Sequence, residues 1–235
     1  TTITGTTIDV GPNKLVANSA GNVGIGTSSP TRKLTVYDTD AYLALQNPTT
    51  GSAAGDGFQL QLVGNDVYHA NYEAGSQIFT TSGSERMRIN SAGIVTKPLQ
   101  PAFLAQPSTT ILNIPTGASG NLNFDAERFD TNSDYSSGTF TAPVTGKYFL
   151  TVNFYFINLD SAASYYEGLL TTSNRTYYTI VDPDFGQDNV YFCLVLTVLA
   201  DMDAGDTANI SVHQGGGSSQ TDISASAIFS GYLVA

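Results

Sequence analysis

The strongest pattern of apolar and polar positions runs from Tyr148 to Ile157 and predicts a long β-strand. Every second residue from Tyr148 to Phe156 is large and apolar, which is the two-residue period of a pleated strand. The residues between them include Phe149 and Tyr155, so the second face is partly apolar as well. Another subunit is the simplest cover for such a second face. We therefore expect this strand to lie between a core and a subunit interface.

The stretch YFCLVLTVL at residues 191–199 repeats this two-faced pattern. It also holds Cys193, the one cysteine of the chain, so the sequence contains neither a disulfide framework nor a cysteine pair for a metal. Buried free cysteine is common, and we expect Cys193 to be a small core residue rather than a nucleophile.

The rest of the pattern divides the chain into three parts. Residues 1–38 hold short Thr- and Gly-rich fragments, which we interpret as a fibre stem because none can bury a core alone. Residues 39–98 form a small β unit or neck, and residues 99–235 form an aromatic-rich head, in which 159–189 is the least regular segment. Within the neck we expect four strands, carried by the segments AYLALQN, GFQLQLVGNDVYHANYEA, SQIFTTSG and SERMRINSAGIV.

Composition supports an all-β protein rich in turns. The chain has 23 Gly and 13 Tyr, no Trp and only 12% charged residues. Its net charge of -11 argues against binding to nucleic acid or to an anionic membrane. The sequence has no apolar run of about 18 residues and no apolar signal at its start, so we expect no membrane insertion, and secretion is unsupported.

A set of spaced residues in the head resembles the globular head of complement component 1q, a relative of tumour necrosis factor. The segments PAFLA at 101–105, LADMDAGD at 199–206 and FSGYL at 229–233 follow the order of that family. The resemblance implies a jelly-roll β-sandwich that assembles as a homotrimer. The spaced residues are Phe124, Asp130, Tyr135, Phe140, Gly146 and Tyr148.

Two strings before the head resemble bacteriophage tail fibres. They are GNVGIGTSSP at 21–30, which is followed by RKLTV, and ERMRIN at 85–90. This resemblance implies the distal part of a tail fibre and a location in the virion. The triplet Gly24-Ile25-Gly26 does not predict a nucleotide site, because Ser29 stands where the third glycine belongs and no helical pattern follows; we expect a sharp β turn.

The irregular segment 159–189 is our predicted receptor-binding region. Aromatic side chains set among small polar residues are typical of surfaces that bind carbohydrate or protein. The alternative is that the tyrosines are ordinary strand positions against the core or the trimer seam. The predicted residues are Tyr165, Tyr166, Asn174, Arg175, Tyr177, Tyr178, Asp184 and Phe185.

Two groups of aspartates leave calcium open as a ligand, although no residue is assigned to a metal. Asp182, Asp184 and Asp188 lie in one loop, and Asp201, Asp203 and Asp206 in another. The second loop lacks the Glu and the helices of an EF-hand, so a solvated turn is the simpler interpretation. We otherwise expect no cofactor.

Catalysis has little support. His69 and His213 lie in different units, and neither has a Ser or Cys in a nucleophile context. We expect no enzyme but the receptor-binding part of a trimeric viral tail fibre, which attaches to a host surface glycan or protein. Two alternatives stay open: a secreted or cell-surface adhesive protein with the same trimeric head, and a tailspike that degrades polysaccharide.

Overall fold

The structure is a computed structural model that describes residues 15–117 and 120–235; the predicted first fragment, TTITGTTIDV, lies outside them. The chain divides into two compact units, Thr1–Thr96 and Lys97–Ala235, which we call the stem and the head. The boundaries predicted at 38/39 and 98/99 remain predictions. The described residues contain strands but no helix, and so no helix that could span a membrane.

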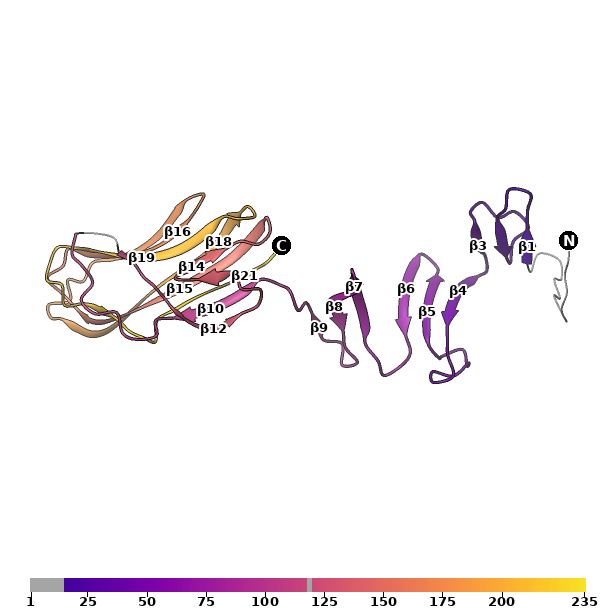
Figure 1. Ribbon diagram of the computed structural model, residues 1–235, viewed down its shortest axis with the longest axis horizontal. Coiled ribbons are helices and arrows are strands. Elements are labelled where there is room, and N and C mark those ends of the chain that lie inside the picture. The colour runs from indigo at the N-terminus through magenta and orange to yellow at the C-terminus, as the bar shows by residue number, and fades with distance from the viewer. Residues whose placement is uncertain (1–14, 118–119) are drawn as a thin grey trace. The chain divides into compact units, whose positions relative to one another are not determined.

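The head is a sandwich of two antiparallel sheets (Figure 1). The first sheet has the order β12-β10-β21-β15-β18, with β20 paired to β15, and the second has the order β13-β14-β19-β16-β17, with β11 paired to β19. Most neighbours in a sheet are distant in sequence, as in a jelly roll, so the predicted all-β jelly-roll head is confirmed. The strands are β10 (Ala102–Gln106), β11 (Gly120–Asn121), β12 (Ala126–Asp130), β13 (Tyr135–Ser136), β14 (Thr139–Thr141), β15 (Gly146–Leu159), β16 (Tyr165–Thr172), β17 (Thr176–Val181), β18 (Asn189–Met202), β19 (Thr207–Gly215), β20 (Asp222–Ile223) and β21 (Ile228–Leu233).

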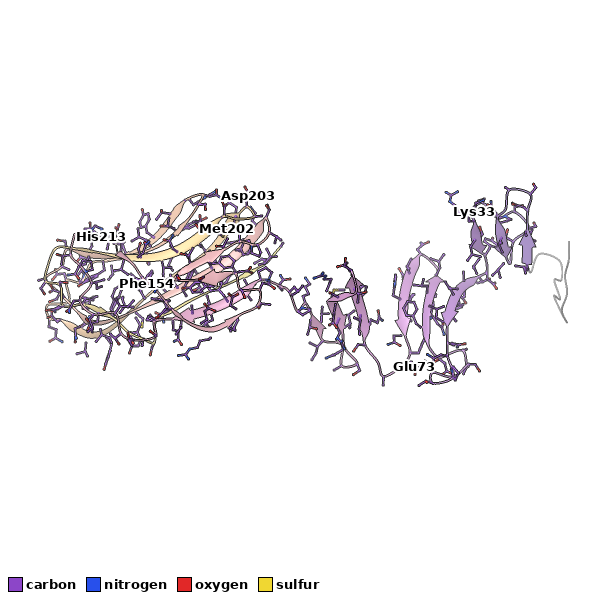
Figure 2. The ribbon with its side chains drawn as sticks, viewed as in Figure 1. Lys33, Glu73, Phe154, Met202, Asp203 and His213 are labelled. Carbon is purple, nitrogen blue, oxygen red and sulfur yellow. The ribbon has the colours of Figure 1, made fainter. Side chains whose placement is uncertain are left out.

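The predicted long strand is confirmed as β15, which pairs with β18 on one side and with β21 on the other. Its core-facing residues are all buried: Tyr148, Leu150, Val152, Phe154 and Phe156. The Phe154 ring, labelled in Figure 2, packs against Gly168 of the opposite sheet. A Cβ at Gly168 would lie 2.3 Å from Phe154 Cε2, so only glycine leaves room for the ring there.

Three of the spaced residues of the head motif, Tyr135, Phe140 and Tyr148, lie in one aromatic cluster. Phe103 of β10 stacks on Tyr135 at a centroid distance of 4.9 Å and on Phe140 at 4.8 Å. It meets Phe229 edge to face at 4.9 Å. The Tyr135 hydroxyl donates a hydrogen bond of 2.9 Å to the Phe124 carbonyl. The motif is therefore a packing unit that joins the two sheets, since stacked and edge-to-face rings add stability beyond their buried area.

The segment 159–189 is more regular than predicted, because it contains all of β16 and β17. The burial of β16 alternates along its whole length. This alternation is hard to see in the sequence because Gly168 and Thr172 occupy two of the four core positions. A strand whose core side includes small or polar residues lacks the apolar period that would reveal it.

The stem consists of three small sheets, β1-β2-β3, β4-β5-β6 and β7-β8-β9. The segment 57–74, predicted as one strand, forms the hairpin of β5 and β6, because Gly64 at φ 60° begins a tight turn. The turn predicted at Gly24–Gly26 is wrong in its position, because Gly24 and Ile25 belong to β2 and the bend begins only at Gly26, whose φ is 78°. The strands are β1 (Leu15–Ala17), β2 (Val23–Ile25), β3 (Leu34–Val36), β4 (Asp40–Leu45), β5 (Phe58–Val63), β6 (Asp66–Asn71), β7 (Gln77–Thr81), β8 (Ser84–Ile89) and β9 (Val95–Thr96).

Burial separates the two units sharply. Among the described residues, every buried Ala, Val, Ile, Leu, Met, Phe or Tyr side chain lies in the head, between Phe103 and Phe229. In the stem, large apolar residues such as Leu45 and Val67 are 61% and 68% exposed. Each stem sheet thus has strand pairing without a core, and three-stranded sheets need an apolar contact to be stable.

Candidate ligand-binding surface of the head

The structure does not bring the eight predicted receptor-binding residues together. The six residues of β17 span about 20 Å, and the predicted residues lie along the strand and beyond both of its ends. They occupy four places: Tyr165 and Tyr166 on β16, Asn174 and Arg175 in the turn before β17, Tyr177 and Tyr178 on β17, and Asp184 and Phe185 in the loop after it.

Tyr166 is a core residue, so its predicted role at the receptor is wrong. Its side chain is 0% exposed. The hydroxyl lies 2.6 Å from Thr221 Oγ1 and accepts a hydrogen bond of 3.1 Å from the Asp160 amide. Burial raises the pKa of this hydroxyl above its ordinary value. Tyr177 also packs against the core and is partly buried, as the alternative interpretation of the tyrosines predicted.

Asn174 and Arg175 link two turns at the end of the head that holds the C-terminus. Asn174 Nδ2 donates hydrogen bonds of 2.9 Å to the Asp201 carbonyl and 3.1 Å to Asp206 Oδ2. Arg175 pairs with the Asp201 carboxylate at 2.9 Å. Figure 2 shows the neighbouring Asp203 near this end of the head, away from His213. Both predicted residues thus have intramolecular partners, although an exposed pair of this kind contributes only about 0–1 kcal/mol.

The aspartates considered for calcium also have protein partners. Asp188 accepts hydrogen bonds from the Ser161 amide at 2.9 Å and from Gln220 Nε2 at 2.8 Å. These bonds, the Ser161 amide first, lower the pKa of the Asp188 carboxyl. Asp206 Oδ2 accepts a 2.9 Å bond from the Asp203 amide. Across residues 15–117 and 120–235, no three His, Cys, Asp or Glu side chains form a group that could hold a metal; calcium binding stays an untested prediction.

Two of the predicted aromatics lie on an exposed sheet surface that we call the Tyr178 face. Tyr178 is 64% exposed and stands opposite Leu169. In the next row, Ile180 stands opposite Glu167, which stands opposite His213. The face is the outer side of β16, β17 and β19 and consists of Tyr165, Glu167, Leu169, Tyr178, Ile180 and His213.

Contacts within the Tyr178 face hold its polar side chains in place. The Tyr165 ring meets the His213 imidazole edge-on, with centroids 5.4 Å apart and an angle of 89°. The same ring lies over Gly215, where a Cβ would come within 2.5 Å of it. His213 Nδ1 lies 3.4 Å from Glu167 Oε2. The face therefore offers flat apolar surface beside fixed hydrogen-bonding groups, a combination that suits ligands with both apolar and hydroxyl-bearing faces.

The sequence analysis missed Glu167, Leu169, Ile180 and His213. The outward alternation of β16 would have pointed to Glu167 and Leu169 once a strand had been assigned there. His213 joins the face only through the pairing of β16 with β19. That pairing has no local pattern in the sequence.

A second exposed surface, the assembly face, covers the outer side of the first sheet. Its apolar residues come from β15, β18 and β21, and the predicted two-faced character of β15 and β18 is confirmed. Cys193 is exposed on this face, opposite Tyr155. The prediction that Cys193 is a small core residue is therefore wrong, because Cys193 lies on the outward side of β18. The face includes Phe149, Tyr155, Tyr191, Val195, Leu199 and Tyr232.

Together, the strand order of the two sheets and the aromatic cluster that joins them define a jelly-roll head of the C1q type, with two exposed faces. Residues 102–234 match the C1q domain family, and the chain belongs to that family. C1q and tumour-necrosis-factor-like proteins are non-enzymatic ligand-binding proteins and typically form homotrimers. The predicted resemblance of the head is therefore confirmed; the resemblance to tail fibres stays a prediction.

Solved structures with a similar fold include the globular domain of the zebrafish complement 1qA protein, with 17% identity and a TM-score of 0.43. That match covers 58% of this chain and 98% of the zebrafish chain. Murine APRIL, in its structure at pH 8.5, has 9% identity and a TM-score of 0.43, with 57% of this chain and 99% of APRIL covered. None of the curated proteins matches the chain.

Proposed function

We propose that this chain is an adhesive protein whose head assembles as a homotrimer and binds a surface glycan through its three Tyr178 faces. The observation that carries the proposal is the Tyr178 face itself. It exposes an aromatic ring on a regular strand of the sandwich, beside a carboxylate and an imidazole held by neighbouring side chains. A sugar ring has one apolar face that stacks on tyrosine and hydroxyls that bond to such groups.

The assembly face supports the trimer. Its large side chains stand on two adjacent long strands, and exposed apolar surface of this extent is typical of a subunit interface. The Tyr178 face lies on the other sheet of the sandwich, so packing through the assembly face leaves it free.

The expected affinity of a single face is low. Stacking on Tyr178 and each good hydrogen bond contribute about 1 kcal/mol. A few such contacts give a dissociation constant near the millimolar range. Three faces on one trimer raise the apparent affinity through a high effective concentration, provided that the ligands are dense on the target surface.

The test is a glycan array probed with the trimeric full chain and with two variants. Tyr178→Ala removes the exposed ring and should lower binding about fivefold per site while the melting temperature stays unchanged. Tyr37→Ala is the matched control, because Tyr37 of the stem is 69% exposed and lies outside the face. Equal binding by all three proteins, or a loss with Tyr37→Ala of the same size, would refute the proposed face.

The second candidate function is a bacteriophage tail fibre, located in the virion, whose head attaches to a host cell surface. The strings at residues 21–30 and 85–90 favour it. Binding of the full chain to a panel of bacterial strains and to their purified surface polysaccharides separates the two candidates. Strain-specific binding that free polysaccharide inhibits supports the tail fibre, whereas binding only to glycans of other cells supports the first candidate.

A further inference from the structure

The central stem sheet has one mainly aliphatic face that is largely exposed, with Leu43 46% and Val67 68% exposed. Residues 76–79 meet only its edge, where they line a cavity with Phe58 and His69. The cross-strand row Leu43–Leu60–His69 lies in its middle, and the row Ala41–Leu62–Val67 lies beside it. A shallow apolar depression follows these residues. We call this surface the stem seam, and it consists of Ala41, Leu43, Leu45, Phe58, Leu60, Leu62, Val67 and His69.

The opposite face of the same sheet, which we call the polar face, carries two glutamines and two aspartates beside Tyr42, Val63 and Tyr68. Gln59 and Gln61 are buried on it. Gln59 Nε2 donates a hydrogen bond of 2.7 Å to the Ala54 carbonyl, and Gln61 Nε2 donates one of 2.8 Å to the Tyr72 hydroxyl. The two faces therefore differ: the buried amides have hydrogen-bond partners on one, and most of the aliphatic side chains are exposed on the other.

Charge separates the two faces in the same way. The strand ends place Asp40 and Asp66 on the polar face, both opposite Val63. The seam itself carries no carboxylate, and His69 is its one titratable residue. In a chain of net charge -11, copies repel one another over most of their surface, but two seams can meet without bringing carboxylates together.

We propose that the stem seams of three copies of this chain pack against one another and form the core that each stem lacks. This proposal rests on the homotrimeric head of the proposed function. A head trimer tethers three identical stems and gives them a high effective concentration. Since this sheet buries no aliphatic or aromatic side chain of its own, its stability depends on a contact that covers the seam, and that cover must be present whenever the stem folds. Other copies of the chain are always present in this way, because each head of the trimer carries one stem.

Chemical cross-linking of the full chain tests the proposal. In a Cys193→Ser background, Leu43→Cys places a thiol on the seam, and Tyr68→Cys places one on the polar face of the same sheet. The pair is closely matched, because Leu43 and Tyr68 are 46% and 47% exposed. With a short bismaleimide, Leu43→Cys should give covalently linked copies as the main product, and Tyr68→Cys should give little at the same protein concentration.

A second pair of variants checks that the contact is apolar. Leu43→Asp should make the stem sensitive to limited proteolysis, whereas Tyr68→Asp should leave it resistant. Sedimentation of each protein distinguishes the two proposals. A trimer in which Leu43→Cys cross-links no better than Tyr68→Cys overturns the stem seam alone. A chain that sediments as a monomer overturns the proposed trimeric function and the seam together.

Discussion

The close contact of Gly168 with Phe154 gives the sharpest test of the head core. In Gly168→Ala, the new Cβ would lie 2.3 Å from Phe154 Cε2 and 2.5 Å from Cδ2, well inside van der Waals contact. The ring is fully buried among the side chains of both sheets, so it has little room to turn. Overpacking of this kind costs roughly 1–3 kcal/mol, and the melting temperature should fall by roughly 4–12 °C.

The assay is denaturant unfolding of the full chain at one fixed protein concentration, since assembly makes stability depend on concentration. Gly120→Ala is the matched control, because a Cβ there would meet only Pro115 Cγ at 3.9 Å. Phe154→Leu in the Gly168→Ala background shortens the side chain and should recover part of the loss, a coupling of roughly 0.5–3 kcal/mol. If Gly168→Ala is as stable as the wild type, or if the double variant is the sum of the single ones, the described contact is wrong.

Three further predictions concern buried hydrogen bonds, acid stability and the assembly face. Tyr166→Phe removes the hydroxyl beside Thr221 and should lower the free energy of unfolding by roughly 1–2 kcal/mol; an unchanged denaturation midpoint contradicts that contact. Hydrogen bonds to Asp160, the one from the Ser218 amide first, lower the pKa of its carboxyl in the folded protein. The stability that Asp160 contributes is therefore complete above the unfolded pKa of about 3.9, and it is lost as the pH falls through the lower folded pKa. Asp160→Asn should therefore lose less stability than the wild type on acidification, and parallel pH profiles would refute this. Cys193 should react with a thiol reagent more slowly in the assembled protein than in dissociated chains, and equal rates would show that the assembly face stays open.

The sequence predicted those parts of the head in which large side chains mark the strand period. Both long strands were found in this way, because nearly every position of β15 and β18 carries a bulky residue. The same pattern could not tell which face of β18 points to the core, so Cys193 was assigned to the wrong side. β16 was missed because Gly168 stands at one of its core positions. The Phe154 ring fills the space there, so the sequence shows no large apolar residue at that point of the strand period.

The candidate site was predictable only in part, for a different reason. Exposed tyrosines in a polar segment pointed to Tyr165 and Tyr178, which do lie on the Tyr178 face. The polar residues beside them are set by the register between neighbouring strands. His213 of β19, for example, lies opposite Glu167 only because β16 and β19 pair in the folded sheet. Tyr165 and Tyr166 have the same local surroundings in the sequence. Because side chains alternate between the two faces of a strand, Tyr166 points into the core while Tyr165 lies on the outer face.

The position of β10 affects how the head bears mechanical load. This strand follows directly from the stem, yet it lies inside its sheet, antiparallel to β12 on one side and to β21 on the other. A pull on Lys97 along the strand axis, with the head held by its ligand, loads the hydrogen bonds of both ladders in shear. Those bonds must break together instead of opening one at a time from an end. If the proposed attachment function holds, force from the stem therefore reaches the head at a strand that is paired along both edges.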